Sequence, residues 1–208
     1  AVVVEAGSGE GYGADILRQE QPRLVAALEY DAACITHIAR TYADVAGVQA
    51  NLAELPIRSG AADVVITLQV IEHLWDLRGF LGDSRRTLRP GGLLVASTPH
   101  RPVFSPGVGR GERPLNPFHV EEFDVDQLRD LLADSGFTDV QVHGLHHGER
   151  IKAWEDIHGD LVRHQIEGLE LEEGSESLDQ FVATVTYADF VVGSPDDAQD
   201  LLVVAYAP

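Results

Sequence analysis

Short apolar runs and stretches of helical periodicity alternate along most of the chain. The runs are rich in valine, leucine and alanine and are short enough for strands, whereas the stretches between them repeat apolar residues every three or four positions. Strands are predicted at residues 2–4, 24–28, 48–50, 62–68, 93–97, 138–142 and 201–205, and helices at residues 14–20, 32–42, 77–88 and 124–135. This order is typical of a doubly wound α/β sheet with helices on both faces.

Two segments interrupt the alternation. Residues 148–193 form an insertion before the last strand, with a predicted helix at 151–166, an acidic stretch at 167–176 and a β-like piece at 181–192. An insertion at this point is a natural place for a substrate lid. Residues 101–118 are rich in proline, glycine and arginine, which predicts a mobile loop over the edge of the sheet.

The first predicted strand runs directly into a loop with glycine at every second position, Gly7, Gly9, Gly11 and Gly13. Glycine tolerates positive φ and has no Cβ to keep a ligand from the backbone. The helix that follows points its N-terminal amides and positive dipole end at the loop. The pattern predicts a nucleotide-binding turn, and Gly9 to Ala14 also satisfies the relaxed dinucleotide fingerprint.

Polar residues follow the second and third predicted strands. Glu29 lies 18 residues after Gly11, close to the position from which a carboxylate binds ribose hydroxyls in such folds. Asp31 is a competitor for that role and can instead cap the next helix. Asn51 stands where an adenine base could be read, or bonds the backbone of its own loop.

Composition narrows the function classes. With 208 residues and 44% hydrophobic content, residues 1–208 form one domain with a substantial core. The formal net charge of −19 disfavours nucleic acid and anionic membranes as partners. A single cysteine and no apolar run near the roughly 20 residues of a membrane span favour a cytoplasmic location. The chain starts inside a predicted strand and lacks methionine, so we expect residues before Ala1.

Five motifs stand in order: Glu5 to Gly11, Glu29, the turn at 51–56, Val70 to Leu74, and Leu88 to Gly92. With them the chain resembles the class I S-adenosylmethionine-dependent methyltransferases, in the small-molecule branch related to ubiquinone-biosynthesis O-methyltransferases. The resemblance covers about residues 1–145 and the last strand. It implies a Rossmann-like, doubly wound seven-stranded sheet in the order 3-2-1-4-5-7-6 with the last strand antiparallel. A dehydrogenase fits the glycine loop alone, but Glu5 and the pair Glu72-His73 favour the methyl donor.

The resemblance also implies how S-adenosylmethionine is bound, with S-adenosylhomocysteine as the product. The implied cofactor-binding residues are Glu5, Gly7, Ser8, Gly9, Gly11, Glu29, Tyr30, Asn51, Leu52 and Gln69. Glu5 would lie near the ammonium group of the donor and Gln69 along its methionine part. Asn51 stands where the family usually has aspartate on the adenine amino group, although an amide oxygen can still accept that bond.

The sulfonium methyl group carries its own activation, so the enzyme has to align the acceptor and exclude water. A hydroxyl acceptor must also lose a proton, for which histidine is the usual base. The predicted catalytic residues are His73, His100 and His119. For His73, packing or donor positioning is the alternative role. His146 and His147 either line the pocket or face solvent.

Some relatives hold a divalent metal with two glutamates and a histidine in this segment. Here Gln69 takes the place of the first glutamate, which leaves Glu72, His73 and His119 as candidate ligands for weakly bound Mg²⁺.

The acceptor has no strong motif. The loop arginines Arg101, Arg110 and Arg113 either recognise an acidic acceptor or carry solvated charge, and Trp154 either stacks on an acceptor or packs in a core. We predict that the protein methylates a hydroxyl group of a sugar, phenol or natural-product intermediate and that it is a monomer or homodimer. N- or C-methylation and a non-catalytic S-adenosylmethionine-binding protein remain alternatives.

Overall fold

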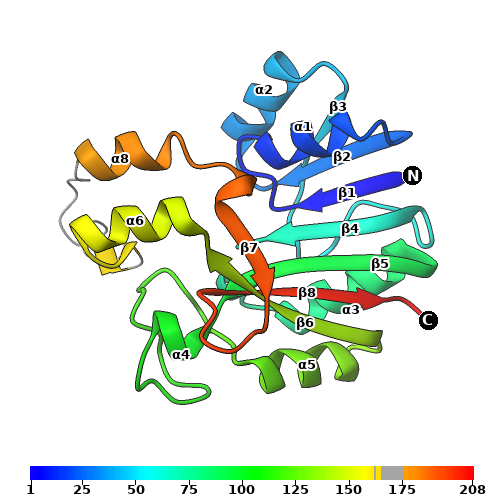
Figure 1. Ribbon diagram of the computed structural model, residues 1–208. Helices are drawn as coiled ribbons and strands as arrows, with labels where there is room; N and C mark the ends of the chain where they lie inside the picture. Colours follow the sequence, from blue (N-terminus) through cyan, green and yellow to red (C-terminus); the bar gives the residue numbers. More distant parts are fainter. Residues whose placement is uncertain (162, 165–175) are drawn as a thin grey trace.

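The computed structural model describes residues 1–161, 163–164 and 176–208. These form one mixed sheet of eight strands in the order β3-β2-β1-β4-β5-β8-β6-β7 (Figure 1). The strands are β1 Val2–Ala6, β2 Leu24–Glu29, β3 Val45–Gln49, β4 Ala62–Leu68, β5 Leu88–Pro99, β6 Thr138–His147, β7 Phe190–Gly193 and β8 Asp200–Tyr206. The helices are α1 Tyr12–Gln19, α2 Ala32–Thr41, η1 Ile71–His73, α3 Leu77–Thr87, α4 Arg101–Phe104, α5 Val125–Asp134, α6 Glu149–His158, α8 Glu176–Val182 and η2 Tyr187–Asp189.

The predicted sheet order is confirmed for the seven expected strands, with β8 as the antiparallel last strand between β5 and β6. The count of seven was too low. The sixth strand continues to His147 instead of ending at residue 142, and its outer edge pairs antiparallel with β7, from Gly144 with Gly193 to His147 with Phe190. The insertion thus returns to the sheet as an eighth strand.

Several elements differ locally from those predicted from the sequence. The motif from Leu88 to Gly92, which we expected to precede the strand at 93–97, lies within the long β5, with Gly91 at a φ of 72°. The predicted helix 151–166 breaks at Gly159, whose φ of 99° disfavours helix. The piece read as β-like at 181–192 contains the end of α8 and η2, so only β7 is strand. Residues 165–175, which include most of the predicted acidic stretch, lie outside the described residues.

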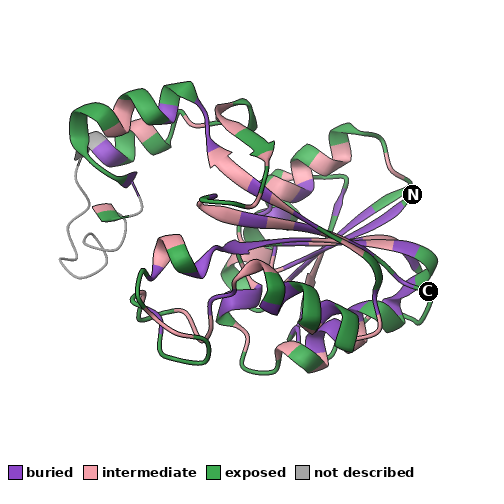
Figure 2. Ribbon diagram, turned by 60° about the horizontal axis from the view of Figure 1, so that its bottom comes forward, coloured by how far each residue is buried: buried purple, intermediate pink, exposed green. Residues whose placement is uncertain are grey.

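Both faces of the sheet are covered, as the two-residue period of β2 illustrates. Val25 and Ala27 pack against α1 and α2, whereas Ala26 and Leu28 belong to the larger cluster shared with α3 and α5. Figure 2 shows the consequence, with buried central strands and helices exposed on their outward faces. No helix among the described residues is both long and apolar enough to cross a membrane.

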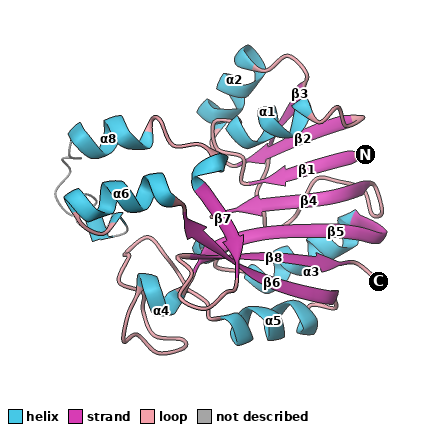
Figure 3. Cartoon of the chain, viewed as in Figure 1, coloured by secondary structure: helices cyan, strands magenta, loops and turns pink. Residues whose placement is uncertain are grey.

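The insertion has a small core of its own. Ile151 is fully buried and clusters with Leu161 and Leu178. Trp154 stacks on Phe181, with 5.1 Å between ring centroids, so it packs within this core and is not free to stack on an acceptor. Figure 3 shows α4, α6 and α8 gathered beyond the end of the sheet to which the arrowheads of β1 and β4 point.

Candidate functional site

The residues predicted to bind the cofactor meet at this carboxyl edge of the parallel strands. Glu5, Gly7, Ser8, Gly9 and Gly11 lie at the end of β1 or just after it, Glu29 and Tyr30 at the end of β2, Asn51 and Leu52 after β3, and Gln69 after β4. The order of the strands places β1 beside both β2 and β4. Residues far apart in the sequence therefore surround one loop.

The glycine loop requires glycine at two positions in particular. Gly7 has a φ of 80°, and a Cβ there would lie 2.5 Å from Cγ2 of Val70. Gly11 has a φ of 91° and precedes α1, and its Cβ would lie 2.7 Å from Cγ1 of Ile38. The backbone amide of Gly7 donates to the carbonyl oxygen of Leu28, which ties the loop to β2. Glycine at these positions therefore lets the loop pack closely against Val70 and Ile38 where it leads into the N-terminus of α1.

Glu5 is buried beneath this loop. It accepts a hydrogen bond from the backbone amide of Ala14, while its Oε2 is buried and has no partner among the described residues. Burial raises the pKa of Glu5 to about 7, because a carboxylate loses its hydration there. A nearby cation would stabilise the charged form, so the site fits the ammonium group of S-adenosylmethionine.

Glu29 faces the glycine loop. Its Oε2 accepts a hydrogen bond of 2.9 Å from the amide of Gly9, and its Oε1 accepts from the amides of Tyr30 and Asp31. Asp31 caps α2 by accepting from the amide of Ala33 at 2.6 Å. Asp31, one of the two acids considered for the ribose, thus caps a helix. Glu29 stays the candidate for the ribose, at the position that the dinucleotide fingerprint favours.

Two polar side chains complete the cofactor edge. Oδ1 of Asn51 accepts a hydrogen bond of 3.0 Å from the amide of Ala53, so Asn51 does bond its own loop, and contact with adenine stays a prediction. Gln69 has a φ of 56°, a conformation that non-glycine residues adopt mainly where the surroundings enforce it. Its Nε2 donates to Oγ of Ser97 at 3.2 Å and to Oδ1 of Asp200 at 3.1 Å.

The structure brings together two of the three predicted catalytic histidines. The rings of His73 and His119 lie 4.9 Å apart between centroids, and both line a cavity of about 560 Å³ that also contacts Phe118 and Arg113. His100 lies elsewhere, beside another cavity, and its Nδ1 bonds the carbonyl oxygen of Ala198. Burial lowers the pKa of His100. A catalytic role for His100 stays a prediction without support from its neighbours.

The partners of His119 define its tautomer. Asn116 accepts a hydrogen bond from the amide of Phe118 through its Oδ1, so its Nδ2 is the group that donates to Nε2 of His119, at 3.0 Å. Nε2 of His119 therefore carries the lone pair, and Nδ1–H donates to Oε1 of Glu122 at 2.6 Å. The side chain of Glu122 is fully buried. Sequence reasoning missed Glu122, for which the one signal was an acid three residues after a candidate histidine.

Glu72 lies beside the two histidines and is almost fully buried. Its Oε2 accepts a hydrogen bond of 3.1 Å from Thr98, and its Oε1 lies 3.8 Å from Nε2 of His73. Burial raises the pKa of Glu72 to about 7, and the nearby carboxylate of Asp200 adds to that effect.

The predicted metal ligands therefore do come together. Glu72, His73 and His119 each offer one ligand atom, all within 4.8 Å of one another. The donor set nevertheless suits Mg²⁺ poorly, because two of the three ligands are imidazoles and Mg²⁺ prefers oxygen. Both ring nitrogens of His119 also have partners, and Gln69 bonds Asp200 and Ser97.

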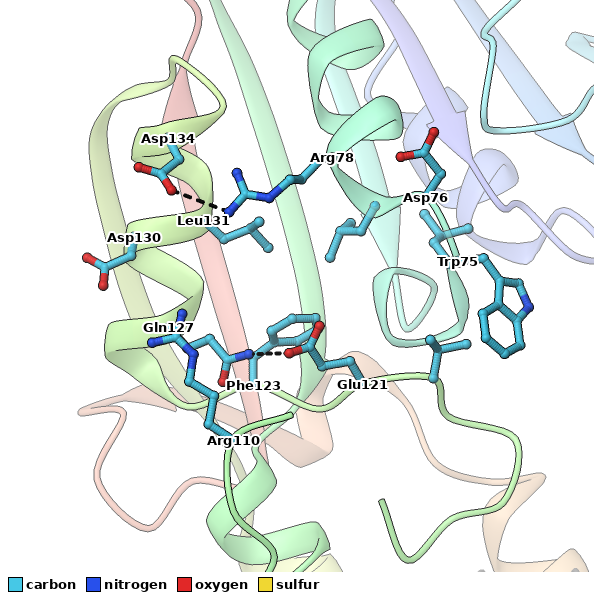
Figure 4. A pocket seen from close by; sticks show the side chains of 13 residues that line it. Trp75, Asp76, Arg78, Arg110, Glu121, Phe123, Gln127, Asp130, Leu131 and Asp134 are labelled. Atoms are coloured by element: carbon cyan, nitrogen blue, oxygen red, sulfur yellow. Dashed lines mark hydrogen bonds and ion pairs between the residues drawn. The ribbon is translucent and has the colours of Figure 1, made fainter. Parts of the chain in front are cut away.

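The loop arginines have different surroundings. Arg101 is buried and pairs with Asp124, so it holds the loop in place and is not solvated charge. Arg110 lines a cavity of about 330 Å³ between η1, α3 and α5 (Figure 4). In Figure 4 the pair of Arg78 and Asp134 spans one side of this cavity. An acidic acceptor here stays a prediction.

Comparison with known proteins gives consistent results. Residues 1–142 match the family model described as a methyltransferase domain. A probable S-adenosylmethionine-dependent methyltransferase of Mycobacterium tuberculosis is 43% identical over 216 residues, covering 99% of this chain and 77% of that protein. A ubiquinone biosynthesis O-methyltransferase of Methylocella silvestris is 32% identical over 108 residues, covering 50% of this chain and 41% of that protein.

Among solved structures, a protein of Thermotoga maritima has the same fold, with a TM-score of 0.65 over 99% of this chain and 81% of that one. It is described as an S-adenosylmethionine-dependent methyltransferase and possible histamine N-methyltransferase. At 15% identity, this similarity concerns the fold alone.

Proposed function

The chain belongs to the class I S-adenosylmethionine-dependent methyltransferases, and on that premise we propose that it methylates a hydroxyl group of a small molecule such as a sugar, a phenol or a natural-product intermediate. The observation that carries the choice of oxygen is the buried pair of His119 and Glu122 beside a cavity. A hydroxyl has to lose a proton during transfer, and this pair forms a base with an orienting acid.

The donor would be held by the edge described above. Bound S-adenosylmethionine supplies an electrophilic methyl group on a sulfonium centre. Glu5 would face its ammonium group and Glu29 its ribose, while the loop from Gly7 to Gly11 approaches the donor with bare backbone. Gln69, three residues before Glu72, would lie along the methionine part.

The proton would move to His119. The acceptor hydroxyl takes the place of the Asn116 amide and donates to Nε2, as the O–C bond forms and the S–C bond breaks. His119 becomes an imidazolium whose Nδ1–H remains bonded to the Glu122 carboxylate, which stabilises the positive charge. His119 would thus act as the base and Glu122 as its orienting acid, while Asn116 bonds Nε2 only until the acceptor displaces it.

The test is release of S-adenosylhomocysteine against a panel of sugars, phenols, amines and carboxylic acids, each with Mg²⁺ and with a chelator. We expect turnover with a hydroxyl acceptor, a change of less than about twofold under chelator, and a loss of roughly 100-fold or more in kcat for His119→Gln. His37→Gln, an exposed histidine on α2, is the control.

Other outcomes separate the alternatives. Full activity of His119→Gln would contradict the assigned base, and loss of activity under chelator would restore Glu72, His73 and His119 as metal ligands. Product with amines alone would make the protein an N-methyltransferase. Binding of S-adenosylmethionine by calorimetry without any product would favour the non-catalytic alternative.

A further inference from the structure

A partly buried carboxylate at the donor edge, Asp200, takes no part in the proposed methyl transfer. Asp200 is the first residue of β8, and because β8 runs antiparallel beside β5, this residue reaches the edge where β5 ends, paired with Pro99. Its Oδ1 accepts the hydrogen bond from Gln69, at 3.1 Å. Among the described residues Oδ2 has no partner, and Asp200 forms no ion pair with arginine or lysine.

His147 lies next to this carboxylate. Leu145 pairs with Asp200 across β6 and β8, and His147, two residues further along β6, is on the same face of the sheet. The side chain of His147 is buried, with an exposed fraction of 6%. The two groups are close enough to interact, since His147 lowers the pKa of Asp200.

The insertion orients this histidine. Nδ1 of His147 lies 3.0 Å from Oε1 of Glu155 on α6, and the same oxygen accepts a hydrogen bond from the amide of Leu161. A carboxylate can only accept, so Nδ1 is the protonated nitrogen and Nε2 is the free one. Among the described residues Nε2 has no hydrogen-bond partner. Asp200 and His147 therefore present two acceptors, Oδ2 and Nε2, on one face beside Gln69.

We propose that Asp200 and His147 bind the acceptor through two neighbouring hydroxyl groups of a neutral polyol, with Glu155 as a positioning residue on the insertion. This proposal rests on the proposed O-methylation. Burial raises the pKa of Asp200 to about 6, so at neutral pH the group is largely charged and incompletely solvated. Donor hydroxyls replace the missing hydrogen bonds.

Charge selects against the other acceptor classes. An acidic acceptor would be repelled by Asp200 and by Glu72, whose carboxylates already interact unfavourably. An amine would bind as an ammonium ion, and the carboxylates would hold its proton and remove the lone pair that must attack the methyl group. A hydroxyl bonded to a carboxylate has neither disadvantage.

The test uses the whole protein saturated with S-adenosylhomocysteine and follows the imidazole carbons of His147 and His119 by NMR, each assigned by its His→Gln variant. The neutral probes are methyl glucoside, methyl mannoside and myo-inositol; glucosamine and glucuronate are the cationic and anionic probes. We expect a neutral probe to shift His147 saturably and to bind at least about tenfold tighter than glucuronate, whereas glucosamine binds as an ammonium ion and is not methylated when S-adenosylmethionine replaces the product.

Variants test whether the shift of His147 depends on Asp200 and Glu155. Asp200→Asn keeps an oxygen for Gln69, so we expect unchanged cofactor affinity but at least about tenfold weaker binding of the neutral probe, since a hydrogen bond to a charged group is lost. Asp197→Asn, an exposed residue of the preceding loop, is the matched control. Glu155→Gln should change the ¹⁵N shifts that report the tautomer of His147, whereas Asp200→Asn should leave the Nδ1–H tautomer in place.

Two results overturn the proposal. The first is that no neutral probe shifts His147 at about 0.1 M, a concentration on the order of the Kd of weak sugar binding. The second is that Asp200→Asn binds the probe as tightly as the wild type. If His147 is silent while methyl transfer to a hydroxyl persists and requires His119, this subsite is wrong and the proposed function stands. If the polyol binds but no acceptor is methylated on oxygen, the proposed function fails instead.

Discussion

Two buried carboxyl groups, Glu5 and Glu72, and the partly buried Asp200 dominate the chemistry at single residues. Glu5, Glu72 and Asp200 lie at the donor edge, and burial raises their pKa values to about 7, about 7 and about 6. Each is a carboxylate held away from water without a neutralising arginine or lysine in an ion pair among the described residues. A site of this kind gains most from a ligand that brings positive charge or hydrogen-bond donors.

Glu5 provides the first prediction at this scale. Glu5→Gln should weaken S-adenosylmethionine binding by roughly 10- to 100-fold, because the charge-assisted contact with the ammonium group, about 1.5–3 kcal/mol, is lost. Isothermal titration calorimetry measures this directly. Glu10→Gln, an exposed glutamate of the same loop, is the control and should bind normally. Equal affinity of Glu5→Gln and wild type would rule out the assigned contact.

Glu122 provides the second prediction for a single residue. Glu122→Gln should lower kcat by roughly 10- to 100-fold with unchanged cofactor affinity, because the neutral amide no longer stabilises the His119 imidazolium and can stabilise the wrong tautomer. Release of S-adenosylhomocysteine gives the rate, and ¹⁵N NMR gives the tautomer. Glu121→Gln, its neighbour, bonds Gln127 and should retain activity. A variant that loses cofactor binding too would indicate a structural role for Glu122.

At the scale of elements, the insertion joins the sheet through the pairing of β7 with β6 and otherwise packs around a core of its own. Its own core holds Ile151 and Trp154, while Arg150 pairs with Asp189 and Glu155 bonds His147. The donor edge is built from other elements, mainly β1, β2, β4 and their loops. The two parts can therefore be perturbed separately.

Ile151→Ala tests this separation. Loss of a fully buried isoleucine costs about 2–5 kcal/mol, which is large for so small a core. Hydrogen exchange should accelerate in α6 and α8, while β1 to β5 keep their protection and cofactor affinity changes by less than about threefold. Ile157→Ala, on the same helix and 78% exposed, should leave exchange unaltered. Loss of protection throughout the sheet would show that the insertion and the sheet unfold together.

At the scale of the whole molecule, the excess of acid opposes folding at high pH. The formal net charge is −19, and Glu5 and Glu72 have folded-state pKa values above their ordinary value of 4.5. Between pH 4.5 and 7 the folded state holds more protons than the unfolded state, so stability falls as pH rises through this window. The contribution of each group is present in full below pH 4.5 and is lost above about pH 7.

Urea unfolding of the protein without cofactor should therefore give a lower free energy of unfolding at pH 8 than at pH 5.5. Each of Glu5 and Glu72 contributes on the order of 2–3 kcal/mol to this difference. Glu5→Gln should flatten the profile and raise stability at pH 8, whereas Glu10→Gln should follow the wild type. Stability that rises between pH 5.5 and 8 would contradict the assigned burial of these charges.

Local pattern determined a large part of the fold. Apolar runs located the strands within a few residues, and β4 lies at Ala62–Leu68 as predicted, because a central strand buried on both faces leaves a continuous apolar signal. The glycine loop, Glu29 and Gln69 could be assigned to one edge, since parallel strands end at the same edge of a sheet. The extension of β6 was not predicted, and β7 was predicted only as the end of a β-like piece at 181–192, because its apolar run does not specify which strand it pairs with.

What the sequence by itself determined is the donor side: a strand, a glycine loop and a helix are contiguous, so their geometry is encoded locally and predicts a nucleotide-binding turn. Glu5 and the pair Glu72-His73 then favour the methyl donor over a dinucleotide. The tertiary structure alone decided which acids and bases meet. Gln69 and Asp200 are 131 positions apart, and they touch only because the last strand enters the sheet in reverse. Likewise, Glu122 orients His119 and Glu155 orients His147 through side-chain contacts that depend on burial, which no spacing along the chain specifies.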